Sequence, residues 1–294
     1  MKNIYSDVKS SIKDLQKIFE NTDGADEGLR AFNQEALEEF KKLESEGLKE
    51  LESLKNNEEW EKFTIAFYGE TGAGKSTLIE CFRLFFKEQS KINQQEQFRR
   101  LYADYAKNPS EHALLALEEC QDGAAIGDGR SDFTLETKSY TLKHNHQSFI
   151  LFDVPGIEGD EKKVKQQISD AIKKAHAIFY VTKTPAPPQK GEEGKEGTIE
   201  KIQKQLDSQT EVYTLFNKPI NSPRVLKDGL IDENEKESLK ILNEKMKAIL
   251  GKHYEGHQIV STQAAFYGLS SALLLESDFY KNKQKFLEVF KVEE

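Results

Sequence analysis

The feature that most constrains the fold is a glycine-rich segment at residues 69–76, which reads Gly69-Glu70-Thr71-Gly72-Ala73-Gly74-Lys75-Ser76. It matches the pattern GxxxxGK[ST] at every fixed position. It follows the apolar run 63–68 and precedes a helical pattern that begins Thr77-Leu78-Ile79-Glu80. A strand, a glycine-rich turn and a helix in this order form a phosphate-binding loop, or P-loop. The sequence therefore predicts an α/β fold with an anion site after its first strand.

The residue types of this loop fit nucleotide phosphates together with Mg²⁺. Glycines allow successive backbone N–H groups to curl around an anion, and the N-terminus of the next helix adds partial positive charge. We expect Lys75 to reach the β- and γ-phosphates and the Ser76 hydroxyl to bind Mg²⁺. The nucleotide-binding residues predicted here are Gly69, Glu70, Thr71, Gly72, Ala73, Gly74, Lys75, Ser76 and Thr77.

Short β-prone runs alternate with helical stretches through most of the chain after residue 60. They lie at residues 63–68, 149–152, 178–181, 212–216 and 258–260. Such alternation is typical of a mostly parallel sheet. Segment 136–146 is the exception, because it leads through a short turn into 148–152 and predicts an antiparallel hairpin at one edge.

Three parts are predicted along the chain. Residues 1–60 form an N-terminal helical segment, in which apolar residues recur at three- and four-residue steps. Residues 61–275 form the α/β domain, with a helical insertion at 88–125, and residues 276–294 form a C-terminal helix. The two helices expected in the first part cannot bury their apolar stripes against each other alone, so they need the rest of the chain or another molecule.

Composition excludes several classes of function. The 42 Lys and Arg residues against 51 Asp and Glu give a net charge of −9, and sequence-independent nucleic-acid binding needs a basic surface. No apolar run approaches the ~18 residues that span a bilayer, and the N-terminus lacks the apolar core of a signal peptide. The only two cysteines, Cys81 and Cys120, fit a reducing compartment. We therefore expect a cytoplasmic protein that does not bind nucleic acid.

A second motif follows the predicted hairpin strand, where the apolar run 149–152 leads into Asp153-Val154-Pro155-Gly156, a DxxG sequence. Asp153, at the carboxyl end of the strand, is expected to hold Mg²⁺. Gly156 is expected to offer its N–H to the γ-phosphate and to begin a loop that reorders when that phosphate leaves. A P-loop followed by a hairpin-delivered DxxG is typical of GTPases. An acidic helicase box and an LSGGQ-like signature are both missing, which argues against the two main ATPase classes.

A threonine that closes over Mg²⁺ and the γ-phosphate is expected between these motifs. The polar loop 127–137 supplies two candidates. Thr137, which borders the next strand, is the first choice, and Thr134 is the alternative.

The base site is expected after the strand 212–216, at Asn217-Lys218-Pro219-Ile220. GTPases usually carry [NT]KxD here, and the Asp accepts two hydrogen bonds from guanine. Asn217 and the stem of Lys218 can still contact the base, but Ile220 stands where the carboxylate belongs, so selectivity for guanine should fall. After the strand 258–260, Ser261-Thr262-Gln263 is expected to contact the base, with the Thr262 N–H serving a base oxygen.

These motifs together resemble the dynamin-like branch of large GTPases, above all the bacterial labile enterotoxin output type. The resemblance covers roughly residues 60–275 and rests on GETGAGKSTLIE (69–80), GDGRSDFTLET (127–137), DVPGIEGDE (153–161) and FYVTKTPAPP (179–188). It implies a G domain that binds GTP and GDP with Mg²⁺, hydrolyses GTP, and dimerises with itself or a partner GTPase across the nucleotide face. It also implies association with a membrane and a helical stalk, which would lie beyond residue 294 or come from a partner.

The chain departs from that family at both positions that usually orient the attacking water. Residue 71 is Thr rather than Gln or Ser, and residue 157 is Ile rather than Gln. We therefore expect slow hydrolysis, with Lys75, Thr137, Thr71 and Glu158 as the catalytic candidates. Two alternatives stay open at this point: an interaction module that binds nucleotide and hydrolyses little, and an ATPase or NTPase with weak guanine selectivity.

Overall fold

The structure is a computed structural model that describes residues 62–126, 137–155, 162–186, 198–204, 206, 210–220, 222–227 and 229–290, and ahead of them residues 13, 14, 17, 34, 37, 38, 41, 42 and 44. The chain divides into two compact units, Met1–Glu61 and Lys62–Glu294. The described residues of the first unit are helical. Most of the helical pattern predicted for residues 1–60 lies outside the described residues. The rest of this account concerns the second unit.

The described part of the second unit is built on a six-stranded sheet with the order β2-β3-β1-β4-β5-β6. The strands are β1 (Phe63–Gly69), β2 (Lys138–His144), β3 (Gln147–Asp153), β4 (Ala177–Thr182), β5 (Glu211–Asn217) and β6 (Tyr254–Val260). All neighbouring pairs are parallel except β2 and β3. The predicted α/β fold and its mostly parallel sheet are confirmed, and every predicted strand is present.

The edge hairpin is as predicted, and its turn explains its register. The two residues between β2 and β3, Asn145 and His146, both have left-handed backbones, with φ of 47° and 66°. A two-residue hairpin loop of this kind matches the twist of the flanking strands. The register that follows pairs Lys138 with Asp153, so the start of β2 lies beside the end of β3.

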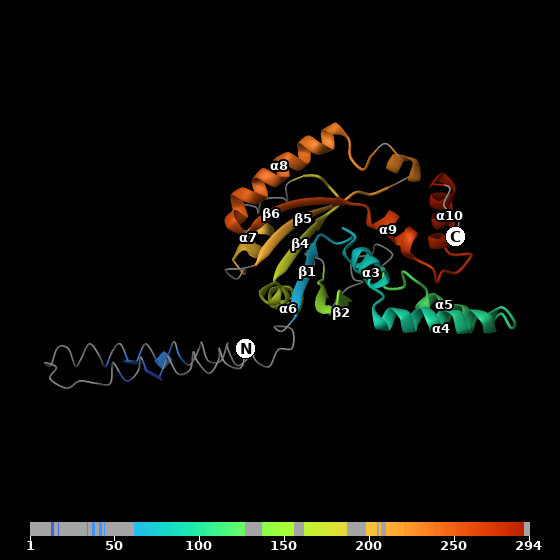
Figure 1. Ribbon diagram of the computed structural model, residues 1–294, viewed down its shortest axis with the longest axis horizontal. Helices are drawn as coiled ribbons and strands as arrows, with labels where there is room; N and C mark the ends of the chain where they lie inside the picture. The colour runs from blue at the N-terminus through green and yellow to red at the C-terminus, as the bar shows by residue number, and fades with distance from the viewer. Residues whose placement is uncertain are drawn as a thin grey trace. The chain divides into compact units, whose positions relative to one another are not determined.

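The helices cover both faces of the sheet (Figure 1). They are α3 (Lys75–Phe85), α4 (Gln89–Tyr105), α5 (Glu111–Cys120), α6 (Lys162–Lys174), α7 (Thr198–Gln203), α8 (Glu233–Leu250), α9 (Thr262–Leu269) and α10 (Asp278–Phe290), with short 3₁₀ turns at Pro223–Lys227 and Gly251–His253. Helices α6, α7 and α8 bury their apolar faces with Ala66, Phe152 and Tyr180 of the sheet. Helix α3 packs on the opposite face, against Phe67 and Leu151. The central strands are buried on both faces, as parallel strands usually are.

Helices α4 and α5 occupy the range in which a helical insertion was predicted. The Ser110 hydroxyl accepts a hydrogen bond from the Ala113 N–H at 3.2 Å and so caps α5, as its place after Asn108-Pro109 indicates. The two helices pack on each other, and α5 contributes Leu117 and Cys120 to a small core with Phe98 of α4.

Helix α10 packs back onto α9 through two ring contacts. The Phe266 and Phe279 rings lie 5.1 Å apart at 67°, and the Tyr267 and Phe286 rings lie 4.9 Å apart. Lys283 of α10 also donates to the Ser270 carbonyl at 2.9 Å. Helix α10 therefore belongs to the same compact unit as the sheet.

A cluster of buried charges joins α3, α4 and the segment after α5. The Lys91 ammonium pairs with the carboxylates of Glu80 and Asp122, and the exposed fraction of none of these three side chains exceeds 2%. Glu80 also accepts from Arg83 at 3.1 Å and from the Gly123 N–H at 3.0 Å. Asp122 accepts hydrogen bonds from the Gln95 side chain and from the backbone N–H groups of residues 271 and 272. Each buried charge is thus paired and hydrogen-bonded, which is the condition for tolerating it in a core.

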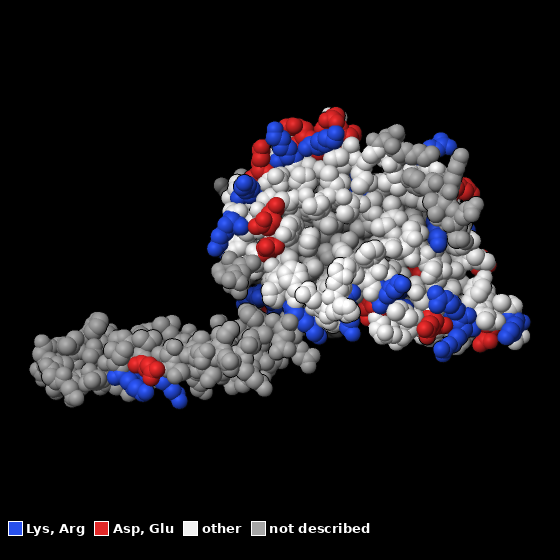
Figure 2. Space-filling view, viewed as in Figure 1, with Lys and Arg blue, Asp and Glu red and all other residues white. Residues whose placement is uncertain are grey.

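The described acidic and basic side chains are interspersed on the visible surface. Figure 2 shows both signs together over α8, and again over α4 and α5. That face carries no broad field of one sign among the residues that the structure describes. None of the helices described is long and apolar enough to cross a membrane.

Removing the cation of the buried cluster tests its contribution to stability. We expect Lys91→Met to lower the free energy of unfolding by about 3–5 kcal/mol, because Asp122 would lose the cation it pairs with and Glu80 would keep only Arg83 as its counter-ion. Urea unfolding measures the change. Arg100→Ala is the matched control, since Arg100 is 82% exposed and 3.9 Å from Glu96, and should shift stability by less than about 0.5 kcal/mol. Equal effects of the two substitutions would contradict the expectation.

Candidate functional site

The P-loop lies where the sequence predicts it, between β1 and α3 at the carboxyl end of the sheet (Figure 1). Lys75 is the first residue of α3, and its side chain folds back over the loop. Its ammonium donates to the carbonyls of Gly69 and Glu70, each at 2.9 Å, and the residue is 7% exposed. The buried Lys75 ammonium is thereby held against the backbone of the P-loop, next to the N-terminus of α3.

Asp153, at the end of β3, is brought to this cation and to Ser76. Burial raises the pKa of the Asp153 carboxyl above its ordinary value of 3.8, although the nearby Lys75 charge and a hydrogen bond from the Ser76 side chain act in the opposite direction. Oδ1 of Asp153 is buried and has no hydrogen-bond partner among the described residues. A desolvated carboxylate oxygen beside a serine hydroxyl is a hard oxygen donor set of the kind that Mg²⁺ prefers.

Thr137, the first candidate for the closing threonine, lies next to this donor set. It directly precedes Lys138, and Lys138 is paired with Asp153 across the hairpin. Thr137 is half-buried. Thr71, the catalytic candidate of the P-loop, is also half-buried and lies between Glu70 and Gly72.

Several predicted site residues lie outside the described part of the chain. They are Thr134, Gly156 and Glu158. Their predicted roles at the γ-phosphate stay predictions.

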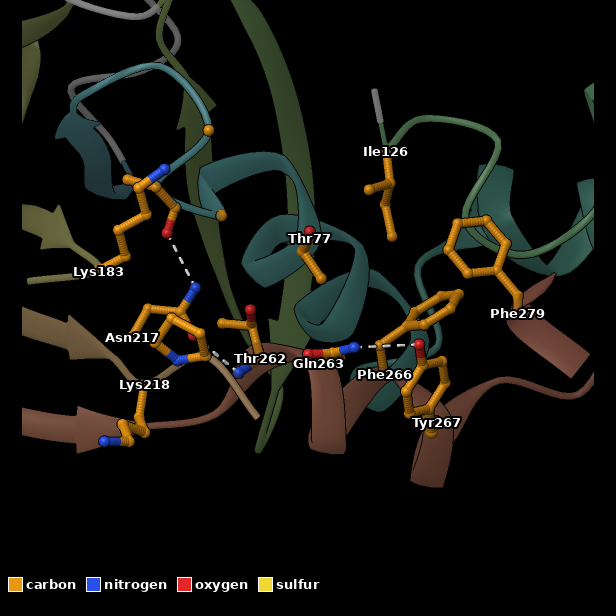
Figure 3. A pocket seen from close by; sticks show the side chains of 14 residues that line it. Thr77, Ile126, Lys183, Asn217, Lys218, Thr262, Gln263, Phe266, Tyr267 and Phe279 are labelled. Atoms are coloured by element: carbon orange, nitrogen blue, oxygen red, sulfur yellow. Dashed lines mark hydrogen bonds between the residues drawn. The ribbon is translucent and has the colours of Figure 1, made fainter. Parts of the chain in front are cut away.

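Asn217 connects the P-loop to the turn after β6. Its side-chain amide donates to the Ala73 carbonyl at 2.8 Å, and its oxygen accepts from the Thr262 N–H at 3.0 Å (Figure 3). The contact requires glycine at residue 74, where φ is 93° and an added Cβ would lie 2.2 Å from the Asn217 amide nitrogen. The Thr262 N–H, which we predicted to serve the base, therefore bonds to Asn217 in the structure.

Ser261 and Gln263, the neighbours of Thr262, have local partners. Ser261 caps α9, with its hydroxyl accepting from the Ala264 N–H at 3.4 Å. The side-chain amide of Gln263 donates to the Tyr267 hydroxyl at 3.3 Å.

Lys218 and Ile220 follow Asn217 in the same loop. The Lys218 ammonium pairs with Glu235 of α8, while the residue still lines the cavity described next. Ile220, in the position of the usual carboxylate, is buried with 3% exposure. The acid that ordinarily reads guanine is thus replaced by an apolar side chain that packs into the protein.

One cavity of about 320 Å³ joins the P-loop to these loops (Figure 3). Of the predicted site residues, it is lined by Gly72, Ala73, Gly74, Thr77, Asn217, Lys218, Thr262 and Gln263. Its size lies at the lower end of the range of small-ligand sites.

The same cavity has lining residues that the sequence did not single out. They are Ile126, Lys183, Pro219, Phe266, Tyr267 and Phe279. Lys183 follows β4, and its ammonium lies 3.7 Å from the position that a Cβ on Gly72 would take. For Lys183, the order of the motifs offers a signal, because it follows a parallel strand at the carboxyl edge of the sheet. The aromatic residues offer none, since Phe279 belongs to a separate helix.

The pKa of Asp153 gives a test by stability. At neutral pH the raised pKa means that ionised Asp153 destabilises the folded state; this cost is fully present above the folded pKa and is relieved as pH falls through it. We therefore expect Asp153→Asn to raise the urea midpoint at pH 7 without ligand, with the gain shrinking toward pH 4. A variant that is less stable than wild type at pH 7 would contradict this.

Comparison with known proteins finds a family model that matches part of the chain. Residues 120–218 match the family model described as the 50S ribosome-binding GTPase. The matched range contains β2 and β3 with Asp153, and it ends at Asn217-Lys218. The comparison with curated proteins found no match.

The comparison with solved structures matches, among others, the following three. The Ski7 GTPase-like domain of S. cerevisiae, bound to GDP and inorganic phosphate, is 14% identical with a TM-score of 0.42, and the match covers 79% of this chain and 51% of that one. A bacterial selenocysteine-specific elongation factor, EF-Sec, is 12% identical with a TM-score of 0.37 and coverage of 79% and 29%. Elongation factor SelB from Methanococcus maripaludis, in complex with the GTP analogue GppNHp, is 9% identical with a TM-score of 0.36 and coverage of 79% and 34%.

This chain spans about half or less of the length of those three structures. The α/β fold with its mostly parallel sheet is that of a G domain, and the P-loop, Asp153 and Asn217 occupy the ends of its strands. Together with the match over residues 120–218, which is about a third of the chain, these features are consistent with a P-loop GTPase G domain.

Proposed function

We propose that this chain hydrolyses GTP slowly, with Mg²⁺ as its cofactor, and that its switch segments change conformation with the bound nucleotide. The observation that carries the proposal is the meeting of Lys75, Ser76 and Asp153 at the carboxyl ends of β1 and β3. These groups supply a cation for the phosphates and two oxygen ligands for a metal. Transfer of a phosphoryl group to water is catalysed mainly by such positioning and charge neutralisation, with little covalent chemistry from the protein.

Lys75 is the group that we expect to neutralise the phosphates. Its present acceptors, the Gly69 and Glu70 carbonyls, are neutral. Exchange of these acceptors for phosphate oxygens turns neutral acceptors into charged ones and strengthens the hydrogen bonds. The ammonium is already buried, so little further desolvation is needed to stabilise the charge that develops on the γ-phosphate.

Ser76 and Asp153 are the residues that we expect to hold Mg²⁺. The buried Oδ1 of Asp153 and the Ser76 hydroxyl fit that metal, and Thr137 stands beside them at the start of β2. When bound, Mg²⁺ supplies positive charge at the phosphate oxygens. With Ser76 and Asp153 fixed on a helix and a strand, the phosphates are oriented before reaction, which is where most of the rate enhancement arises.

The rate is expected to be low, because neither usual water-orienting residue is present at positions 71 and 157. Discrimination between guanine and adenine is expected to be weak, because Ile220 is buried and offers no acceptor to the base. A polar site that lacks its bidentate reader loses a large factor in selectivity.

A second candidate is a nucleotide-dependent interaction module that hydrolyses little. Thr71 and Ile157 favour it, since both replace groups that usually position water. The dynamin-like resemblance, a homodimer or partner GTPase, membrane association and cytoplasmic location stay predictions from the sequence.

Calorimetric titration tests the nucleotide site. We expect wild type to bind GDP with Mg²⁺, and Lys75→Ala to weaken binding by about 10- to 100-fold, because a charge-assisted contact to phosphate is lost. Lys107→Ala is the matched control, because the Lys107 side chain is exposed and its ammonium lies 4.0 Å from the Asp104 carboxylate. It should leave binding unchanged. Normal binding by Lys75→Ala would overturn the site, and equal affinity for ADP and GDP would overturn GTP as the specific substrate while leaving a nucleotide site in place.

Turnover of GTP at several protein concentrations separates hydrolase from module. A measurable rate that falls at least about 100-fold in Asp153→Asn supports Mg²⁺-dependent hydrolysis, since the metal loses a ligand worth several kcal/mol. A rate per molecule that rises with concentration indicates activation by dimerisation. A rate at the uncatalysed background at every concentration supports the module instead.

A further inference from the structure

The cavity next to the P-loop has a polar part and an aromatic part. Figure 3 shows Asn217, Lys218 and Lys183 on one side of Thr77, and Phe266, Tyr267 and Phe279 on the other. The residues that line it, all within the described part of the chain, include no Asp or Glu. A nucleoside in this cavity therefore meets aromatic rings rather than a carboxylate.

Phe279 is the ring of this group that is open to a ligand. Phe266 and Tyr267 are buried, with 1% and 4% exposure, whereas Phe279 is half-buried. An aromatic ring offers its face to any purine, and stacking of a base on such a ring depends little on the identity of the base.

The Phe279 ring is fixed by its surroundings rather than loosely attached. It packs edge-on against Phe266, with centroids 5.1 Å apart at 67°. Both rings pack against Gly123, whose φ is 88° and where an added Cβ would come within 2.8 Å of the Phe266 ring and 2.9 Å of the Phe279 ring. The Gly123 N–H is in turn held by the buried Glu80 at 3.0 Å. The ring is thus positioned before any ligand arrives, which lowers the entropy cost of binding.

The helix that carries Phe279 is also anchored. Phe286, two turns along α10, lies against Tyr267, and Lys283 donates to the Ser270 carbonyl at 2.9 Å. The Ser277 hydroxyl accepts from the Tyr280 N–H at 3.2 Å and caps the start of the helix. Helix α10 is therefore a constant part of the cavity wall.

We propose that Phe279 of α10 contacts the nucleotide base, so that base binding in this chain rests on stacking against the C-terminal helix and not on a carboxylate. The inference rests on the proposed nucleotide site. It adds to that site a residue that lies outside the P-loop, the DxxG segment and the two base loops. It gives the C-terminal helix a direct part in ligand binding. It also explains how a purine is retained when Ile220 is buried.

Calorimetry on the full chain tests the proposal with GDP, ADP and tripolyphosphate, which has no base. Phe279→Ala should weaken GDP and ADP alike, by about fivefold or more, and leave tripolyphosphate unchanged. Phe279→Trp should keep wild-type affinity, because it restores a stacking face. Phe286→Ala is the matched control for packing, since it removes a ring of the same helix that packs on Tyr267 but does not line the cavity, and it should weaken GDP and ADP binding less than Phe279→Ala does.

A fluorescence measurement separates base contact from a purely structural effect. The diphosphate of 2-aminopurine riboside loses fluorescence when its base stacks on an aromatic ring. Quenching by wild type and by Phe286→Ala, but not by Phe279→Ala, supports the contact. Equal quenching by all three proteins overturns it.

The outcomes of the titration distinguish this inference from the proposed function. If wild type binds GDP, Lys75→Ala binds it more weakly as expected, and Phe279→Ala binds as wild type, the nucleotide site stands and the role of Phe279 is wrong. If Phe279→Ala and Phe286→Ala weaken binding equally, or if tripolyphosphate binding falls with them, Phe279 acts through the fold and the proposal is also wrong. If wild type binds no nucleotide, both fail.

Discussion

The candidate site depends on one buried side chain, Asn217, which holds two loops in register. The two loops follow β1 and β6, which lie three strands apart in the sheet, and Asn217 from β5 bonds to both of them. These bonds satisfy the Ala73 carbonyl and the Thr262 N–H, and a buried backbone group left without a partner is costly. Since glycine at residue 74 is what allows the approach, the P-loop sequence serves the connection between loops as well as the phosphates.

Buried charges in this protein fall into two kinds, and the difference separates structure from function. Glu80, Lys91 and Asp122 have their charges paired, and the carboxylates of Glu80 and Asp122 also accept hydrogen bonds from backbone N–H groups. Asp153 instead keeps one buried oxygen that no described residue hydrogen-bonds, and burial raises its pKa despite the nearby Lys75. A chain tolerates a buried charge of this kind where a ligand completes it, so a buried carboxylate with an unbonded oxygen beside the P-loop points to a ligand there.

The fold was largely predictable from the sequence because its signals are local. The apolar runs, the GxxxxGK[ST] turn and the hairpin each fall within a single stretch of at most 16 residues, and all of them lie where we predicted. Lys91 illustrates what could not be predicted. Its helix is rich in Gln, Glu and Arg and looks solvent-exposed, and Lys91 is buried only because Glu80 and Asp122 come to it from other elements.

For the candidate site, the sequence likewise predicted which residues take part but not the partners that their side chains find. The order of motifs along the chain indicated Lys75, Asp153 and Asn217, because parallel strands bring their carboxyl ends to one edge. That order says nothing of which partners a side chain finds. The Thr262 N–H is taken by Asn217, and the Lys218 ammonium by Glu235, through contacts that span 45 and 17 residues. Phe279 lies further still from any motif, and a terminal helix with an apolar stripe does not reveal which surface that stripe meets.

The loop 127–137 is predicted to carry the threonine that closes over the γ-phosphate. The described residues on its two sides are held by contacts of different kinds. On one side, the Asp122 carboxylate accepts from residues 271 and 272, and Gly123 is held between Glu80 and the rings of Phe266 and Phe279. On the other side, Lys138 is paired with Asp153 in the β2–β3 hairpin. In the first set of contacts, the rings of Phe266 and Phe279 also line the cavity. The second is the backbone pairing of β2 with β3, which ends at the residue expected to hold the metal. The described residues that flank 127–136 therefore lie at the proposed nucleotide site on both sides, Ile126 in the cavity wall and Lys138 opposite Asp153.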